Sequence, residues 1–133
     1  ADSGLDAPGS GGFAAVDVET LRHPEHARVW AIGDVADLGD ARTGGALRVQ
    51  VRIVVENIRR SRAGLPLERY DGYTVAPIAT SRRSLSFGEY DRALRVRRTL
   101  PVPDEIRSSP LWHLLDRYGL PQVYWHRILR GRL

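Results

Sequence analysis

The sequence has 133 residues, 42% hydrophobic and 27% charged, which is globular composition and argues against a disordered chain. All 20 basic residues are arginine, and the net charge of +4 is spread along the chain without the basic stripe of a nucleic-acid-binding module, so we expect no nucleic-acid partner. Cysteine is absent, which excludes disulfides and thiolate metal sites. Methionine is also absent, and the first residues resemble the middle of a loop, so we expect a fragment or a processed product.

Residues 1–12 are expected to form a flexible lead, followed by a short strand over Phe13–Val16. His23 and His26 lie three residues apart, a spacing that metal sites use, but no carboxylate cluster lies near them. We interpret them as a loop pair and expect no metal site. The continuous apolar run Val29–Ile32 predicts a strand that is buried on both faces.

Gly33 and Asp34 follow this strand directly and mark a sharp stop. In α/β sheets ligands bind at the carboxyl ends of the strands, and a glycine lets a ligand approach the backbone closely. The position therefore suits a polar, phosphate- or flavin-bearing ligand. The pair alone is a weak signal, because Asp34 has the ordinary alternative role of capping a turn.

Helical periodicity runs over residues 46–60, with one apolar face (Leu47, Val51, Val54, Val55 and Ile58). Thr43 is the expected N-cap, and Gly44 and Gly45 allow a ligand to come close to the backbone. The amino-terminal end of a helix carries about half a positive charge. Directed at a flavin ring, that charge would favour the anionic reduced form.

Residues 74–80 and 85–90 are rich in β-forming side chains and predict an antiparallel hairpin. The Tyr70-Asp-Gly-Tyr73 segment before them predicts a turn.

Ser109 and Pro110 predict a helix start, with Ser109 as N-cap, and Gly119 is expected to end that helix. A second helix is expected from Pro121, with aromatic and arginine side chains on opposite sides. Two interpretations stay open: the helices lie in a membrane interface, or they pack as a hairpin on their own domain. The elements together predict an α+β fold with short strands, one long helix, a β-hairpin and two C-terminal helices.

These residues resemble a known family. The run Val29–Ile32 with Gly33-Asp34 is similar to the second FAD-binding signature of the pyridine nucleotide-disulfide oxidoreductases, which are flavoproteins with two dinucleotide domains. Three later motifs resemble the C-terminal part of sulfide:quinone oxidoreductases: Tyr70-Asp-Gly-Tyr-Thr74 followed by Pro77, the hairpin ending Glu89-Tyr-Asp91, and Tyr124-Trp125 with Leu129-Arg-Gly131. The resemblance covers about residues 12 to 132 in the same order.

The resemblance implies an FAD-dependent oxidoreductase that passes electrons through its flavin to a quinone. Asp34 would hydrogen-bond the ribityl chain of FAD, while Thr43, Gly44 and Gly45 would bring backbone N–H groups to the isoalloxazine ring. The hairpin and the C-terminal helices would form the quinone pocket and the membrane-facing surface. Four aromatic residues are candidates for that pocket, although each has the simpler explanation of a core residue: Phe87, Tyr90, Tyr124 and Trp125.

The resemblance also implies an organisation. Residues 13–66 would be the C-terminal part of the FAD-binding domain, and residues 67–133 a quinone- or membrane-side region. The partners would be a quinone or a membrane surface, together with N-terminal domains outside this chain. The protein would be cytoplasmic or peripheral on the cytoplasmic face of the membrane.

Two features depart from the family. The redox cysteine that sulfide oxidisers place before the proline is Ala76 here, and a chain without cysteine supplies no thiolate. NAD(P)H or another electron donor is therefore an alternative to sulfide. The first Gly-x-Gly-x-x-Gly is absent, since Gly9-Ser-Gly-Gly12 has the wrong spacing and no preceding strand.

We therefore expect a C-terminal fragment that is inactive alone, contains no catalytic residue, and binds FAD weakly or not at all. Its apolar strand and helix face would be left uncovered, so we expect self-association. The alternative is a stand-alone small binding module that contacts anionic lipid or a protein partner. The upstream coding sequence distinguishes the two.

Overall fold

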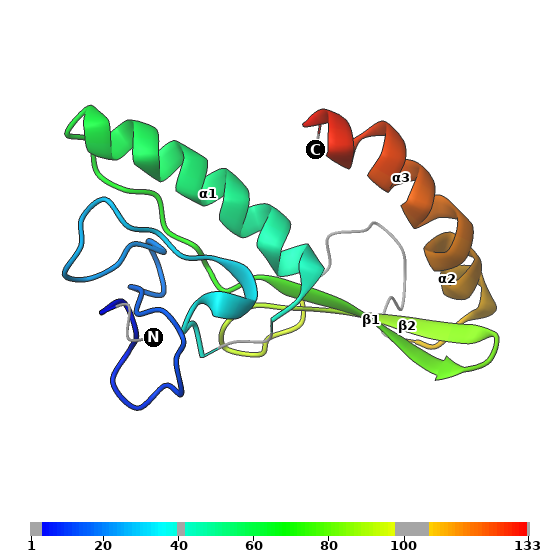
Figure 1. The fold of residues 1–133 in the computed structure, drawn as a ribbon. Coiled ribbons are helices and arrows are strands. Elements are labelled where there is room, and N and C mark those ends of the chain that lie inside the picture. The colour runs from blue at the N-terminus through cyan, green and yellow to red at the C-terminus, as the bar shows by residue number, and fades with distance from the viewer. Residues whose placement is uncertain (1–3, 40–41, 98–106, 133) are drawn as a thin grey trace. The chain divides into compact units, whose positions relative to one another are not determined.

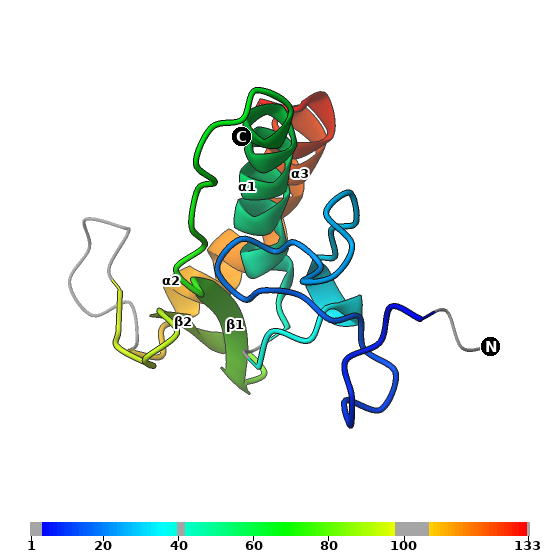
Figure 2. The ribbon, with the colours of Figure 1, turned by 90° about the vertical axis from the view of Figure 1, so that its left-hand side faces the viewer.

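The computed structural model describes residues 4–39, 42–97 and 107–132 and contains two compact units. Unit 1 comprises Ala1–Val75 and Tyr90–Arg97, and unit 2 comprises Ala76–Glu89 and Arg98–Leu133. Figures 1 and 2 show the elements, which confirm the α+β class. In chain order they are η1 (Gly33–Val35), α1 (Gly44–Arg62), β1 (Thr74–Ser81), β2 (Ser84–Tyr90), α2 (Pro110–Leu114), η2 (Leu115–Gly119), α3 (Leu120–His126) and η3 (Ile128–Arg130).

The long helix α1 begins where the sequence predicts. Thr43 has extended backbone angles, and its side chain accepts a hydrogen bond from the N–H of Ala46 (3.1 Å), which confirms the N-cap. The helix continues two residues beyond the predicted end at Arg60, and Gly64 then turns the chain with a φ of 67°.

The buried face of α1 is different from the predicted apolar face. Leu47, Val51 and Val55 are 38%, 43% and 46% exposed, so most of the predicted stripe faces outward. The buried residues lie three or four positions apart on a neighbouring face: Ala46, Gln50, Ile53, Val54 and Asn57. They pack against the core of unit 1, which consists of Leu21, Ala36, Leu38, Ile53, Val54 and Tyr70.

Asn57 shows why a polar side chain lies on this buried face. It is fully buried, and its Nδ2 donates to the carbonyl oxygens of Thr20 (3.1 Å) and Glu68 (3.0 Å). Its Oδ1 accepts from the N–H of Glu68 (2.7 Å). One side chain therefore satisfies three backbone polar groups in two loops, which do not belong to a helix or a β-sheet.

The two short strands predicted in the N-terminal part are wrong as strands. Ala14 forms only isolated bridges, with Asp6 and with Ala36, and Trp30 forms one with Arg22. The run Val29–Ile32 is half-buried rather than buried on both faces. No neighbouring strand among the described residues continues these pairings, so each remains a single bridge.

The predicted hairpin is confirmed as the two-stranded sheet β1–β2. The segment before it has no hydrogen-bonded backbone turn; instead Gly72 has a φ of 77°, and the Asp71 carboxylate accepts from the N–H of Tyr73 (3.1 Å). A Cβ at position 72 would lie 2.5 Å from Cβ of Arg92 and 3.0 Å from its Cα. Glycine is therefore required where these two segments of unit 1 touch.

In unit 2, Ser109 caps α2 as predicted, accepting from the N–H of Leu111 (3.1 Å), with Pro110 in the first turn. The expected end at Gly119 is wrong, because Gly119 has right-handed helical angles and the chain continues through the π-turn η2 into α3. The N–H of Leu120 bonds to the carbonyl of Leu115, so the wider turn carries the helix past Pro121, which has no N–H to donate.

Candidate functional site

Gly33 forms a sharp turn that a side chain of α1 holds in place. Its φ of 67° lies in the left-handed region, and the turn continues as η1. The N–H of Gly33 donates to Oε1 of Gln50 (2.8 Å). A Cβ at position 33 would lie 3.1 Å from Cδ1 of Leu47, so glycine also lets η1 approach the first turns of α1. The predicted sharp stop is confirmed.

Asp34 and the amino-terminal end of α1 offer complementary polar groups. The side chain of Asp34 is exposed in η1, and η1 contacts α1. Among the described residues, none accepts a hydrogen bond from the N–H of Gly44 or Gly45. Free N–H groups at a helix N-terminus attract polar or anionic groups. Asp34 thus follows directly on Gly33, which packs against Leu47 and Gln50 in the first two turns of α1, and the helix start supplies backbone donors for a ligand.

The two glycines of the helix start differ in their surroundings. A Cβ on Gly44 would meet no atom within 4 Å, which leaves room for a ligand. A Cβ on Gly45 would overlap Cγ1 of Val75 and lie 3.2 Å from the carbonyl oxygen of Val75. Gly45 is thus required by the packing of α1 against the first residues of β1. The Thr43 hydroxyl lies 3.0 Å from the hydroxyl of Thr74 and fixes the same contact.

Sequence reasoning missed the residues that position the Gly33 turn. Gln50 is 3% exposed, and its Nε2 donates to the hydroxyl of Tyr70 (3.3 Å). That hydroxyl donates in turn to the carbonyl of Tyr73 (2.6 Å). A chain of hydrogen bonds thus ties Gly33 to the Tyr70-Asp-Gly-Tyr73 segment. The available signal was the spacing of Ala46, Gln50, Ile53 and Asn57, which share one helix face.

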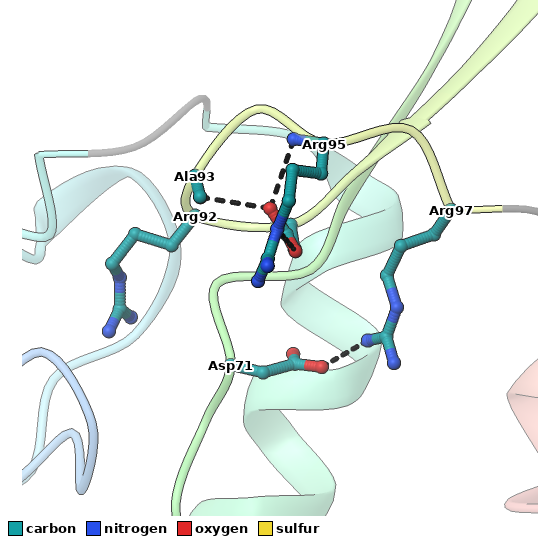
Figure 3. A pocket seen from close by; sticks show the side chains of 6 residues that line it. Asp71, Arg92, Ala93, Arg95 and Arg97 are labelled. Atoms are coloured by element: carbon teal, nitrogen blue, oxygen red, sulfur yellow. Dashed lines mark hydrogen bonds and ion pairs between the residues drawn. The ribbon is translucent and has the colours of Figure 1, made fainter.

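Charged residues line a pocket of about 440 Å³ in unit 1 (Figure 3). Asp71 pairs with Arg97, and Asp91 accepts from Nε of Arg95 (2.9 Å). Desolvation alone would raise the pKa of Asp91, but hydrogen bonds from the N–H and side chain of Arg95 outweigh it, so this pKa lies below its usual value. Each of these carboxylates is therefore paired with an arginine, and the two ion pairs hold the loop 91–97 in place.

Comparison with known proteins finds relatives of one kind. No family model matches the sequence. The chain is 36% identical over 122 residues to the mitochondrial sulfide:quinone oxidoreductase of Dictyostelium discoideum. It is 30% identical over 129 residues to that of Mus musculus and 28% over 140 residues to that of Schizosaccharomyces pombe. These alignments cover 91%, 92% and 95% of this chain.

The chain is a relative of the sulfide:quinone oxidoreductases. The predicted resemblance to this family is therefore confirmed. The chain spans 27%, 27% and 28% of the length of the three curated sulfide:quinone oxidoreductases, so most of each relative has no counterpart here.

A solved structure shows the same fold. A chain in the cryo-EM structure of the Tetrahymena thermophila mitochondrial ATP synthase F1Fo composite tetramer superimposes with a TM-score of 0.79. The match covers 92% of this chain and 30% of that chain, at 22% sequence identity. At this identity the likeness concerns the fold alone.

The aromatic candidates for a quinone pocket have separate surroundings in this relative of the sulfide:quinone oxidoreductases. In unit 2, half-buried Phe87 makes an edge-to-face contact with Trp112 (ring centroids 5.5 Å apart). Tyr124 and Trp125 also contact each other edge to face (5.6 Å) and are 47% and 62% exposed. Tyr90 belongs to unit 1, where it bridges to Val96. Their role at a quinone stays a prediction.

The histidine pair lies in a turn. Nδ1 of buried His23 accepts from the N–H groups of Glu25 and His26, both at 3.1 Å. Over residues 4–39, 42–97 and 107–132, no three metal-binding side chains form a group that could hold an ion. In the same described residues, no helix has the length and apolar character needed to cross a membrane.

Proposed function

We propose that this chain is the C-terminal section of an FAD-dependent oxidoreductase of the sulfide:quinone oxidoreductase type, in which electrons pass through the flavin to a quinone. One observation carries the proposal: in a relative of that family, the turn that contains Gly33 and Asp34 contacts α1, whose first two N–H groups have no acceptor among the described residues. A redox flavin needs hydroxyl-binding and ring-edge contacts of this kind.

The residues present fit this part of FAD. Asp34 has an exposed carboxylate that can accept hydrogen bonds from the ribityl hydroxyls. The N–H groups of Gly44 and Gly45 and the positive end of α1 suit the polar edge of the flavin ring. Thr43 contributes by starting the helix, and Gln50 by holding Gly33. When bound, the flavin accepts an electron pair from a donor and passes it on.

The electron donor is a separate question. This chain supplies no cysteine sulfur that could form a disulfide for sulfide to attack, because it contains no cysteine, and Ala76 stands where the family resemblance expects one. We propose NAD(P)H or another small reductant as the donor if the longer protein also lacks a suitable cysteine.

The exposed stripe of α1 is a proposed contact with the rest of the longer protein. Leu47, Val51 and Val55 form an outward apolar face on a helix whose neighbouring face is already packed. Separated from those parts, the chain would be inactive, bind FAD weakly, and associate with other copies. We further propose peripheral attachment on the cytoplasmic face of a membrane, through the aromatic and arginine residues of the segment 110–132.

The direct test is to produce the protein that the complete reading frame encodes and to record its absorption spectrum. We expect a bound flavin that sulfide or NADH bleaches without oxygen and that a soluble quinone then restores. A colourless protein that fails to take up FAD would contradict the proposal. It would favour a stand-alone binding module, above all if no Gly-x-Gly-x-x-Gly precedes this chain.

A further inference from the structure

Two adjacent arginines form the tip of the hairpin, within unit 2. Arg82 and Arg83 connect β1, which ends at Ser81, to β2, which begins at Ser84. The N–H of Arg83 donates to Oγ of Ser81 (3.3 Å), and Oγ1 of Thr80 donates to the carbonyl of Ser84 (3.1 Å). These bonds fix the tip, so the two exposed arginines project from a defined turn.

The hairpin is fastened to α2 by backbone and aromatic contacts within the same unit. Leu85 and Ser109 exchange two backbone hydrogen bonds, of 3.2 Å and 2.9 Å. Trp112, 8% exposed, packs edge to face on Phe87 of β2. The tip of the hairpin and the helical segment after Pro110 are therefore parts of one packed body.

Between the tip and this segment lies a pocket of about 330 Å³, which we call the arginine pocket. Its polar lining is cationic or imidazole (Arg82, Arg83, His113 and Arg117), and Leu114 and Tyr118 provide apolar walls. No carboxylate lines it. None of the ion pairs between described residues involves Arg82, Arg83 or Arg117.

We propose that the arginine pocket binds the phosphate of an anionic phospholipid headgroup. Guanidinium groups match phosphate oxygens in charge and in their paired donor geometry. Three of them surround one hollow and form no ion pair with the carboxylates that the structure describes, so the hollow suits an anion. The inference deepens the proposed membrane attachment and rests on it.

The surroundings of the pocket identify the anion as a lipid. Leu111, Leu114 and Tyr118 are 65%, 52% and 61% exposed on the same short helical segment that carries His113 and Arg117. Apolar side chains of this exposure suit the boundary between headgroups and acyl chains. A free phosphate ion would leave them in water, whereas a phospholipid engages the arginines and the apolar side chains together.

The test is vesicle binding of this chain, measured by co-sedimentation with phosphatidylcholine alone and with phosphatidylcholine mixed with phosphatidylglycerol. We expect clear preference for the anionic vesicles. Combined Arg82→Gln and Arg83→Gln should lower that affinity about tenfold or more, because an arginine near an anionic surface contributes strongly to binding. Arg117→Gln should lower it less.

The matched control is Arg59→Gln with Arg62→Gln. Both are exposed arginines in the last turn of α1, in unit 1, so the pair removes the same charge elsewhere. Full binding by this control supports a defined pocket, and an equal loss by both double variants overturns it in favour of overall charge. Circular dichroism of all variants verifies that each remains folded.

The remaining outcomes separate the inference from the proposed function. Equal binding to both vesicle types keeps the membrane attachment but overturns the headgroup site. If the chain binds neither vesicle type, the membrane attachment and the headgroup site are both overturned. The flavin proposal is then still tested separately, by the absorption spectrum of the longer protein. Inorganic phosphate that binds the pocket without vesicles, and blocks vesicle binding at low concentration, would show a free-phosphate site and overturn the lipid assignment.

Discussion

The two units differ in how their charged side chains are paired. In unit 1, Gln50 and Asn57 are buried and hydrogen-bonded, and Arg60, Arg69, Arg95 and Arg97 form ion pairs with carboxylates. Unit 2 buries Ser86 and Glu89 but leaves all its described arginines exposed. Its described part contains seven arginines against two carboxylates, Glu89 and Asp116, and most of its large apolar side chains after Pro110 are exposed.

This difference shows where the molecule stabilises itself and where it keeps surface for something else. Unit 1 holds the Gly33 turn through Gln50, a buried side chain that is hydrogen-bonded to Gly33 and to Tyr70. Unit 2 has one well-buried aromatic anchor and leaves cations and apolar groups available. The first pattern suits a ligand site that must be positioned, and the second suits a surface that meets a partner.

The largest expected effect is on the anchor of unit 2. Trp112→Ala removes a nearly buried aromatic side chain and its contact with Phe87, which should cost about 4 kcal/mol of local stability. Hydrogen exchange of the β2 amides measures it. Trp125→Ala, at a side chain that is 62% exposed, is the control and should change little. Equal protection in both variants would mean that unit 2 has no such anchor.

The next effect concerns buried polar groups in unit 1. Asn57→Ala leaves the carbonyls of Thr20 and Glu68 and the N–H of Glu68 without their partner, at a cost of about 3 kcal/mol. The loss of stability is measured by urea unfolding, with hydrogen exchange of the α1 amides as the probe. Arg59→Ala, at an exposed neighbouring position, is the control. If Asn57→Ala lowered the free energy of unfolding no more than the control does, Asn57 would not stabilise unit 1 as proposed.

A smaller effect is expected at the contact between two backbone segments of unit 1. Gly72→Ala combines left-handed strain with a Cβ placed 2.5 Å from Cβ of Arg92, and should cost about 2 kcal/mol. Gly64→Ala is the matched control, since it has a φ of 67° but open space around it. The difference between their unfolding midpoints isolates the clash. Identical midpoints would show that the segments separate freely.

The smallest effect is a local titration in unit 1. Hydrogen bonds from Thr20 lower the pKa of Asp17 below its ordinary value; the bond from the hydroxyl has the larger effect and the bond from the N–H the smaller one. Because the folded pKa is depressed, the stabilisation is present above the unfolded pKa and is lost as the pH falls through the folded value. Thr20→Val should raise the Asp17 pKa toward its ordinary value, measured by NMR titration. No change would remove the hydroxyl as the cause.

Local signals predicted the elements that depend on neighbouring residues. The Thr43 cap, the hairpin and the Ser109-Pro110 helix start follow from chemistry within a few residues, and the structure contains all three. Glycine after the Val29–Ile32 run likewise predicted the turn at Gly33. The fold class and the family resemblance followed from these elements and their order.

Tertiary contacts were the part that the sequence did not reveal. Apolar periodicity selected the outward face of α1, because Gln50 and Asn57 become buried only through hydrogen bonds to distant segments. The arginine pocket joins a hairpin turn to a helix about thirty residues later, so no local spacing marks it. Gly119 failed as a helix end because the π-turn depends on the packing of Leu115 beside it.

The central claim is that the turn at Gly33 and Asp34 belongs to a flavin site. The most direct measurement is the FAD dissociation constant of the protein encoded by the complete reading frame, with and without Asp34→Ala. We expect affinity about tenfold weaker in the variant, because hydrogen bonds to a charged acceptor are lost, and no change for Glu25→Ala, at an exposed position in another loop. Unchanged FAD affinity in Asp34→Ala would contradict it.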